Sequence, residues 1–387
     1  MNETNNAGRP LRILQAINQL SRQGAEKFVV QLSRALNRQP DLEVKILITE
    51  NTNDFAEELR AADVEVVYIP AQTGPLRTTN IAQLESFLQD FRPDVIHSHI
   101  LPVDALFTAC TYRAQHYLFH IHSSRYTGYV NPRFRLKQWR ENLGDYLLKR
   151  KVLQLSRQVH TQFITVSAYD RQEVQHYLPA SAQLAYLRNG IELPESIVEQ
   201  ETASDSRILI SVGRLDENKN QLFQLKVLRK LVRQDPRFSL VLLGTGPELE
   251  TLEAYVHAHQ LSAYVHFSGS VPDVYTALQH ASLFLHTARS EALSLAIMEA
   301  IACSLPVVML NGNGNAELAA SAGVAMIDAE NETLFADRIL EIFGNESLFT
   351  QMQRDNLQFA TGFSMDAYVL QWRQLLESGS AVSGIFD

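Results

Sequence analysis

Two loops of the chain carry charged side chains at spacings that suit an extended anionic ligand. In SVGRLDENKNQ (211–221), Arg214 and Lys219 lie five residues apart, between an expected strand and an expected helix. Arginine offers a planar fork of donors and lysine a point charge, so two fixed cations of this kind suit a diphosphate. The simpler alternative is a pair of solvated cations on a surface loop.

The segment SEALSLAIMEA (290–300) places two carboxylates, Glu291 and Glu299, eight residues apart. On one helix they lie about 12 Å apart, too far to share a proton or a metal but suited to a ligand with hydroxyls at both ends. The helix N-terminus expected near Glu291 favours phosphate through its unpaired N–H groups and its dipole. Alternatively, Glu291 only caps the helix and Glu299 is solvated, although an unpartnered carboxylate in the apolar run LAIMEAIA is costly to bury.

Four histidines, His97, His99, His120 and His122, form two pairs at i, i+2 spacing on expected strands. Each pair places its rings on one face of a strand, so chelation of a metal is geometrically feasible. No cysteine or cluster of carboxylates accompanies them, and the chain contains no Asp-x-Asp motif. We therefore expect no metal site, and we expect His97 and His120 to be partly buried or solvated strand residues.

These residues follow apolar runs that alternate with segments of helical periodicity such as 24–36 and 222–234. Continuous apolar runs between helices are typical of a doubly wound parallel sheet, which binds ligands beyond the carboxyl ends of its strands. The functional residues are therefore expected in the loops after strands. The strand-like runs are 11–17, 43–49, 64–70, 93–99, 116–122, 206–213, 238–244, 263–269, 281–287, 305–311 and 323–328.

The pattern restarts after a polar stretch at 193–206, and a length of 387 residues also indicates two domains. We expect an α/β fold of two Rossmann-like, doubly wound parallel-sheet domains that face each other across a cleft. The N-terminal domain is expected at 1–190 and the C-terminal domain at 191–363. The remaining segment, 364–387, contains a stretch of helical period at 365–378.

The composition excludes several classes of protein. Apolar residues make up 45% and charged residues 20% of the chain, so disorder is excluded as the main state. A net charge of −9 argues against nucleic-acid binding, and two distant cysteines do not form a secreted disulfide framework. The first residues lack the pattern of a signal peptide and no run of eighteen apolar residues occurs, so we expect a cytoplasmic protein.

One segment, 125–157, is locally basic, with nine Lys and Arg residues, two acidic residues and interleaved aromatic side chains. Such a patch suits an anionic membrane surface, which would place the protein peripherally at the inner membrane face. It equally suits a lipid-diphosphate acceptor, and a solvated basic helix face is the third alternative.

The motifs of the second half, taken in order, resemble those of the retaining nucleotide-sugar glycosyltransferases of family 4, which have the GT-B fold. That family shows a strand ending in Gly-Arg, a Lys soon after, a Glu-x7-Glu pair, a Pro-Val-Val segment and a later acidic residue. Here these stand as VGRLDENK, SEALSLAIMEA, CSLPVV (303–308) and NAEL (315–318). Gly246 and Val271 stand in LLGTGPELETLE and HFSGSVPDVYTAL, which look like the segments that flank the nucleotide base.

The first half resembles the same family at fewer positions. LSRQGAEKFV (20–29) is similar to the glycine-rich loop after the first strand, with Gly24 retained and Gln23 in place of the first glycine. FHIHSS is similar to the strand whose closing histidine, here His122, faces the sugar. The segment 363–372 resembles the C-terminal helix that crosses back to the first domain. A further departure is Ala292, where the family usually has glycine, and we expect both departures to alter the substrate fit.

The resemblance implies transfer of a sugar, with retention, from a nucleoside-diphosphate sugar to a hydroxyl acceptor in polysaccharide or lipid-linked glycan synthesis. In this interpretation Glu291 holds hydroxyls of the donor sugar, and Glu299 holds the ribose. Gly24 and His122 lie on the acceptor side, and His122 orients the sugar. The groups implied for the diphosphate are Arg214, Lys219 and the N–H groups of Ala292, Leu293 and Ser294.

The resemblance further implies a metal-independent enzyme with no permanently bound cofactor, in which the cationic pair and the helix dipole replace a divalent cation. Two alternatives stay open: a sugar-nucleotide epimerase, and a non-catalytic GT-B partner subunit. A dinucleotide dehydrogenase is disfavoured because NQLSRQGAE, after the first strand, lacks G-x-G-x-x-G.

Overall fold

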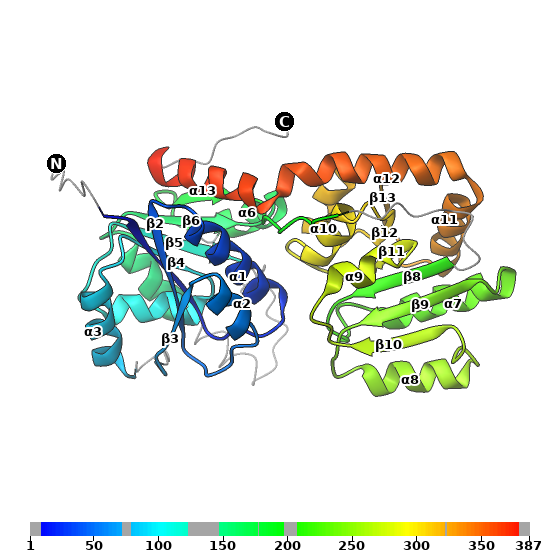
Figure 1. The fold of residues 1–387 in the computed structure, drawn as a ribbon, viewed down its shortest axis with the longest axis horizontal. Coiled ribbons are helices and arrows are strands. Elements are labelled where there is room, and N and C mark those ends of the chain that lie inside the picture. Colours follow the sequence, from blue (N-terminus) through cyan, green and yellow to red (C-terminus); the bar gives the residue numbers. More distant parts are fainter. Residues whose placement is uncertain are drawn as a thin grey trace. The chain divides into compact units, whose positions relative to one another are not determined.

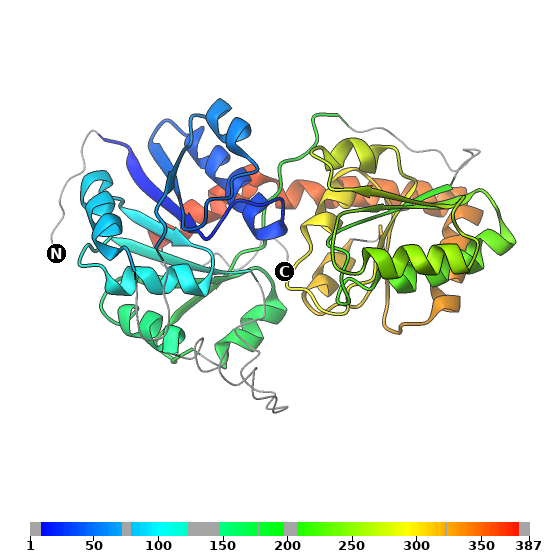
Figure 2. The same ribbon diagram turned by 90° about the horizontal axis from the view of Figure 1, so that it is seen from below.

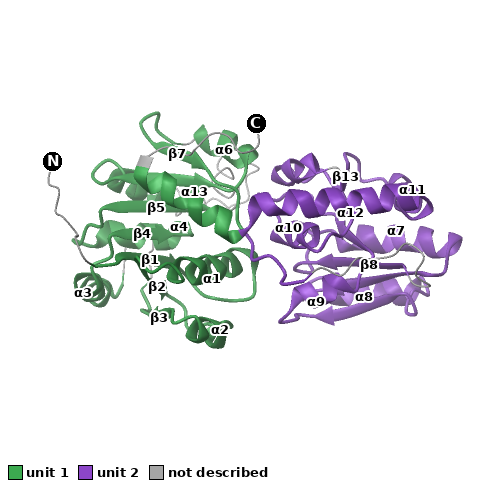
Figure 3. Ribbon diagram, turned by 45° about the horizontal axis from the view of Figure 1, so that its top comes forward, with its two compact units in different colours: residues 1–190, 365–387 green, residues 191–364 purple. Residues whose placement is uncertain are grey.

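The structure is a computed structural model that describes residues 9–71, 79–122, 147–176, 178–196, 207–321 and 323–378. The chain divides into two compact units (Figure 3). Unit 1 combines Met1–Gly190 with Met365–Asp387, and unit 2 is Ile191–Ser364. Each unit contains a wholly parallel sheet with helices on both faces (Figures 1 and 2). The two α/β sheets agree with the expected fold class.

Unit 1 holds a seven-stranded sheet in the order β3-β2-β1-β4-β5-β6-β7. The order reverses direction between β1 and β4, and a reversal of this kind is where open α/β sheets leave room for ligands. The strands are β1 Leu11–Ile17, β2 Leu42–Ile48, β3 Glu65–Tyr68, β4 Val95–Ser98, β5 His116–Ile121, β6 Thr161–Thr165 and β7 Gln183–Tyr186.

The helices of unit 1 come from both ends of the chain, because the C-terminal helix α13 belongs to this unit and packs beside α1. Helix α13 buries Tyr368, Trp372 and Leu375, which stand at helical spacing, so its apolar face packs against the core of unit 1. The helices are α1 Gly24–Asn37, α2 Ala56–Ala61, α3 Ile81–Phe91, α4 Leu101–Asp104, η1 Ala105–Ala109, α6 Ala168–Gln175 and α13 Met365–Ser378, with 147–155 also helical.

Unit 2 holds a six-stranded sheet in the order β10-β9-β8-β11-β12-β13. Its strands are β8 Arg207–Val212, β9 Phe238–Leu243, β10 Val265–Gly269, β11 Leu283–His286, β12 Val307–Leu310 and β13 Val324–Ile327. Its helices are α7 Gln221–Gln234, α8 Leu249–Ala258, α9 Val274–Gln279, α10 Leu295–Ala302, η3 Gly314–Ala320, α11 Glu332–Gly344, α12 Glu346–Ala360 and η4 Thr361–Phe363.

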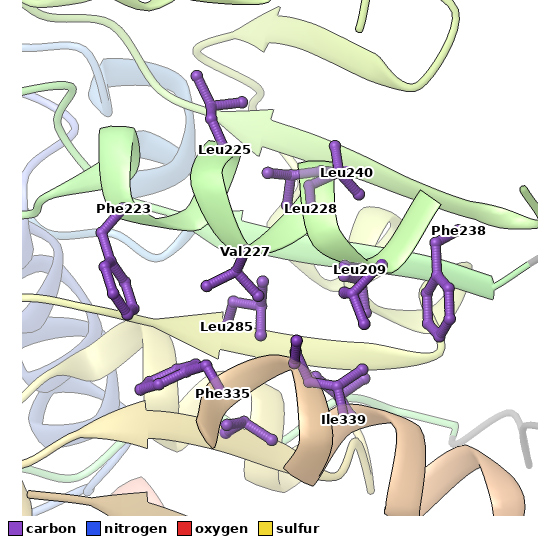
Figure 4. Packing of buried hydrophobic residues seen from close by; sticks show 14 of the residues in the cluster. Leu209, Phe223, Leu225, Val227, Leu228, Phe238, Leu240, Leu285, Phe335 and Ile339 are labelled. Carbon is purple, nitrogen blue, oxygen red and sulfur yellow. The ribbon is translucent and has the colours of Figure 1, made fainter. Parts of the chain in front are cut away.

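The core of unit 2 lies between the sheet and helices α7 and α11 (Figure 4). Leu209 and Leu285 come from neighbouring strands and are fully buried, as is Ile339 of α11. The rings of Phe223 and Phe335 meet edge to face with centroids 5.1 Å apart, an arrangement that aromatic pairs prefer. This core fixes the strands whose carboxyl ends carry the charged loops.

The apolar runs predicted the strands within two residues at each end, apart from two strands that they did not reveal. Strands β6 and β7 are short and carry polar residues, as in TQFIT, so they lack the continuous apolar character of their neighbours. The polar stretch 193–206 is described only as far as residue 196, where it forms no helix or strand.

Candidate active site

The loops that follow the strands of unit 2 meet at one edge of the sheet, because all six strands are parallel. Backbone hydrogen bonds join these loops in the order of the strands. Leu215 N–H donates to Thr245 O over 3.0 Å, Gly244 N–H to Gly269 O over 2.7 Å, and Arg289 N–H to Asn218 O over 2.9 Å. The loops after β8, β9, β10 and β11, which are far apart in the sequence, are therefore joined by hydrogen bonds at this edge of the sheet.

Two glycines permit the closest approaches between these loops. A Cβ atom on Gly244, whose φ is +135°, would lie 2.0 Å from Gly213 O. A Cβ atom on Gly246 would lie 2.2 Å from Leu215 O. No real Cβ contact is this short, so the loop after β9 is pressed against the loop after β8 only because these residues lack side chains.

Lys219 and Glu291 form an ion pair at this edge, between Nζ and Oε1. The side chains are 24% and 11% exposed, so both charges are largely removed from water. Burial lowers the pKa of Lys219 to about 8, although the neighbouring Asp216 opposes this shift. Lys219 extends past Gly213, where an added Cβ would lie 3.6 Å from its Cε. The structure thus brings together two of the residues that the motifs singled out.

A hydrogen-bond network holds the Lys219 loop against the Glu291 loop. Thr287 Oγ1 donates to the backbone carbonyl of Lys219 over 3.0 Å and itself accepts from Gln224 Nε2 over 2.9 Å. Asn218 Nδ2 donates to Ser290 O over 2.9 Å. The position of the ion pair is therefore set by the loop backbones and not only by the two charges.

His286 and Asn315, which were not among the expected site residues, complete the surroundings of Glu291. His286 Nε2, at the end of β11, lies 3.3 Å from Glu291 Oε2, and burial holds the pKa of His286 well below its ordinary value. Asn315 Nδ2 lies 3.2 Å from His286 Nε2 and 3.5 Å from Glu291 Oε2. His286 stands near the end of the strand-like run 281–287 and Asn315 four residues after the run 305–311, so the sequence indicated that both lie near the carboxyl edge of the sheet but not that they contact Glu291.

The expectation that Glu291 and Glu299 share one helix is wrong. Helix α10 begins at Leu295, with Ser294 as its N-cap, and Glu291 instead forms a β-bridge with Asn313. Ser294 N–H donates to Asn315 Oδ1 over 2.8 Å, so one of the N–H groups expected to hold the diphosphate is already paired. The chain bends here because the bridge draws Glu291 towards the loop after β12.

The other expected donor-site residues lie in these same loops but differ in exposure. The side chain of Arg214 is 61% exposed, and its Nε lies 3.8 Å from Asp216 Oδ2. Ala292 and Leu293 are buried just before α10, whereas Val271 is half-buried after β10. The structure therefore places Arg214 at the rim of the surface on which Lys219 and Glu291 meet.

Glu299 is 3% exposed, so it is not a solvated helix residue. Burial, and after it the negative charge of Glu299, raises the pKa of Tyr275 on α9 and that of Cys303, the latter to about 12. Tyr275 Oη in turn donates to the carbonyl of Glu192. The carboxylate of Glu299, on α10, is thus buried inside unit 2.

In unit 1, Gly24 is the first residue of α1, and Gln23 is its N-cap. The Gln23 side chain does not cap the helix but donates from Nε2 to Ser21 Oγ over 3.2 Å. Ser21 Oγ also donates to Glu26 Oε1 over 3.4 Å, and burial raises the pKa of Glu26. Gln23 is therefore part of the hydrogen-bonded loop and does not simply fill the space of a glycine.

His122 belongs to a stack of four imidazole rings on one face of the unit 1 sheet. Its Nε2 lies 2.9 Å from His99 Nδ1, and His97 Nε2 lies 3.2 Å from His120 Nδ1. His97, His99 and His120 are at most 1% exposed, which corrects the expectation that His97 and His120 are partly buried or solvated: both are fully buried. Helices α1 and α13 cover this face with Phe28, Tyr368 and Trp372.

Among the described residues, His97, His99 and His120 are the group whose geometry comes nearest to a metal site, with ligand atoms within 4.8 Å of one another. Zinc ligands at about 2.0 Å from the ion lie closer together than this, near 3.3 Å. His97 Nε2, His120 Nδ1 and His99 Nδ1 are engaged in contacts between imidazoles. Metal binding would break those contacts, which argues against it. The expectation of no metal site stays a prediction.

Most of the basic segment 125–157 lies outside the described residues, which resume at 147. In the described part, Lys149 is 8% exposed and burial lowers its pKa to about 8. No helix in the described part of the chain has the length and apolar character needed to span a bilayer.

Two protein-family models match this chain. The family model described as Glycosyltransferase Family 4 matches residues 22–194, and that described as Glycosyl transferases group 1 matches residues 194–358. EpsF of Bacillus subtilis, whose name describes it as a glycosyltransferase, is 24% identical over 77% of this chain and 78% of its own. A Mycolicibacterium smegmatis protein named GDP-mannose-dependent alpha-(1-6)-phosphatidylinositol monomannoside mannosyltransferase is 27% identical, over 39% of this chain and 44% of its own.

Solved structures show the same architecture. Anabaena Alr3699/HepE in complex with UDP and glucose superposes with a TM-score of 0.77 at 16% identity, over 95% of this chain and 100% of the other. A variant of S. aureus TarM in complex with Fondaparinux, alpha-GlcNAc-glycerol and UDP gives 0.75 at 10% identity, over 94% and 99%. The fold is thus that of a GT-B glycosyltransferase. The two family models adjoin and together span residues 22–358, and the chain belongs to the family 4 glycosyltransferases.

Proposed function

We propose that this glycosyltransferase moves a sugar from a nucleoside-diphosphate sugar to a hydroxyl acceptor with retention at the anomeric carbon, and without a metal ion. The Lys219–Glu291 ion pair carries this proposal. It joins a cation suited to a diphosphate with a carboxylate suited to sugar hydroxyls, at the carboxyl edge of a parallel sheet.

The two charges neutralise each other in the ligand-free protein. A bound diphosphate would replace Glu291 as the partner of Lys219, and Glu291 would then accept hydrogen bonds from hydroxyls of the donor sugar. Because the site is largely buried, each charge-assisted bond to the leaving diphosphate is worth about 1.5–3 kcal/mol. Arg214, at the exposed rim, would reach the same diphosphate from solvent.

The remaining roles are those that the resemblance to the family implies. Glu299 would hold the ribose hydroxyls, and Gly246 and Val271 would flank the base. His122 and Gly24 would lie on the acceptor side. Asn315 accepts a hydrogen bond from Ser294 N–H and donates one to Glu291 Oε2, so it would act by positioning the carboxylate of Glu291. The nucleotide-sugar domain is accordingly unit 2, and the acceptor-binding domain is unit 1.

Two relatives bear on the acceptor. The M. smegmatis protein acts, by its name, on a phosphatidylinositol mannoside, and one from Salmonella typhimurium, 28% identical over 44% of this chain and 45% of its own, is named for colanic acid biosynthesis. We therefore propose a glycan or lipid-linked glycan acceptor, with the cytoplasmic chain at an anionic membrane surface through 125–157.

A thermal-shift screen against nucleotide sugars tests the donor. At a hundredfold excess over its Kd, the correct donor stabilises the protein by about 2.7 kcal/mol, which raises Tm by roughly 5–10 °C. Turnover with that donor in EDTA, followed by NMR of the anomeric proton of the product, then tests metal independence and retention. Release of an isomerised sugar without an acceptor would instead identify an epimerase.

The matched variants are Lys219→Ala and Lys230→Ala. Lys230 lies on α7, eleven residues further along the chain, and is half-exposed. We expect transferase activity to fall only in the first variant. Equal activities would remove the assignment of the ion pair to the diphosphate.

A further inference from the structure

A row of three side chains connects the interior of unit 1 to His122. Gln15 Oε1 on β1 lies 2.6 Å from His99 Nε2, and His99 Nδ1 lies 2.9 Å from His122 Nε2. Gln15 and His99 are at most 1% exposed, whereas His122 is partly exposed. The row therefore starts at a fully buried side chain and ends at the least buried residue of the three.

The hydrogen-bond roles along this row follow from its first member. A neutral imidazole has one N–H donor and one acceptor nitrogen, and a glutamine carbonyl oxygen only accepts. With the Gln15 amide oriented as in the structure, its oxygen facing His99 and its Nε2 buried without a hydrogen-bond partner in the described residues, His99 donates from Nε2 to Gln15, which leaves its Nδ1 as an acceptor. His122 must then donate from Nε2 to His99, and its own lone pair is on Nδ1.

The surroundings of the rings keep them neutral. Burial lowers the pKa of His99 well below its ordinary value, and the neighbouring rings of His97, His120 and His122 lower it further. The groups packed on the rings from α1 and α13 are Phe28 and Trp372, which carry no charge. A second proton on His99 Nδ1 would face the Nε2–H donor of His122 and break the row, whereas a second proton on His122 would occupy the Nδ1 lone pair at the end of the row.

We propose that Gln15 and His99 are positioning residues that hold His122 in its Nε2–H tautomer, so that His122 Nδ1 accepts a hydrogen bond from a hydroxyl of the sugar or the acceptor. This inference rests on the proposed placement of His122 beside the substrate. It adds that the hydroxyl must be the donor of that hydrogen bond, so a substrate lacking this hydroxyl loses the contact.

The neighbouring pair shows why the first member matters. His97 Nε2 lies 3.2 Å from His120 Nδ1, but His97 Nδ1 and His120 Nε2 are buried with no hydrogen-bond partner in the described structure. No third group sets the direction of that pair, so either ring can donate. Only the row that begins at Gln15 has its direction set.

The direct test is the tautomer of each histidine in the full-length protein labelled with ¹⁵N-histidine, read from long-range ¹H–¹⁵N correlations at pH 7. Signals are assigned with His99→Asn and His122→Asn. We expect Nε2–H for both His99 and His122. An Nδ1–H tautomer at His122 in the unaltered protein overturns the proposal, and so does a shift of the His99 signals on adding Zn²⁺, because a ligating nitrogen cannot fill its role in the row.

The variant Gln15→Met removes the acceptor at similar side-chain length. Its matched control is Gln162→Met, because Gln162 on β6 is equally buried and makes a single hydrogen bond, from Nε2 to Leu375 O over 3.3 Å. We expect Gln15→Met to give both tautomers at His122 and a kcat lowered about five- to tenfold, with the Tm shift from the nucleoside diphosphate unchanged. The control should keep the Nε2–H tautomer and its kcat.

The two proposals fail in distinguishable ways. An Nε2–H signal at His122 that persists in Gln15→Met overturns the positioning role, whatever the activity. If the unaltered protein transfers no sugar from any donor, the proposed function fails, and the inferred use of His122 Nδ1 fails with it. If kcat is unchanged while the tautomer does shift, the link to the reaction is refuted and the proposed function stands.

Discussion

Acidification below pH 6.5 should destabilise unit 1 more than unit 2, because unit 1 encloses His97, His99 and His120 as neutral rings, whereas the buried neutral ring described in unit 2 is that of His286. Burial lowers the pKa of His97 to about 3 and those of His99 and His120 well below the ordinary value. In the unfolded chain a histidine titrates near 6.5. The unfolded state therefore binds more protons than the folded state between pH 6.5 and the folded pKa, and stability is lost as the pH falls through this window.

The magnitude follows from the number of buried rings. Between pH 7.5 and 5.5, each ring that stays neutral in the folded state lowers the free energy of unfolding by about 1.4 kcal/mol. Three rings give about 4 kcal/mol, a large part of the total stability of a typical domain. His122 is not among these three, but burial lowers its pKa to about 3 as well, so a fourth ring that stays neutral would add about 1.4 kcal/mol.

Tryptophan fluorescence in urea provides the assay. Trp372 is buried in unit 1, so its signal reports the unfolding of that unit, whereas the other tryptophan, Trp139, lies outside the described residues. His97→Gln should reduce the loss between pH 7.5 and 5.5 by about 1.4 kcal/mol, whatever it does to the stability at pH 7.5. His176→Gln, at an exposed position of the same unit, should leave the loss unchanged. A total loss below about 1.5 kcal/mol would refute the presence of three buried neutral rings.

Four substitutions in unit 2 test the site. Lys219→Ala should lower kcat about 10- to 100-fold, as expected for loss of one charge-assisted bond to the leaving group, and steady-state kinetics showing an unchanged kcat would contradict this. Glu299→Ala should mainly raise the donor KM, and an unaltered nucleotide Kd by calorimetry would exclude its ribose contact. Asn315→Leu should lower kcat and, because it leaves Ser294 N–H unpaired, destabilise the protein by about 1–3 kcal/mol. A wild-type kcat together with a wild-type free energy of unfolding would count against the positioning role of Asn315. Gly246→Ala should reduce Tm by several degrees in calorimetry, because its Cβ would meet backbone at 2.2 Å, whereas Gly344→Ala, where no atom lies within 4 Å, serves as the control.

The local sequence determined the class of fold and the location of the charged loops. Continuous apolar runs predict buried parallel strands because both faces of such strands are covered, and this property is visible in any window of six or seven residues. The periodicity of 365–378 likewise marked the helix that the structure places at Met365–Ser378. The ordered motifs placed Lys219 in a loop after a strand, and Glu291 at the start of a helix that follows a strand, for the same local reason.

The tertiary structure alone decided which of these side chains meet. The motifs put Glu291 and Glu299 on one helix, yet the bridge between Glu291 and Asn313 delays the start of α10 to Leu295. Asn315 stands 24 residues from Glu291 and Gln15 stands 84 residues from His99, and no local pattern predicts such contacts. Hydrogen-bond partners depend on sheet order and loop packing, which bring distant residues to one edge, whereas periodicity reports only which face of its own strand or helix is buried.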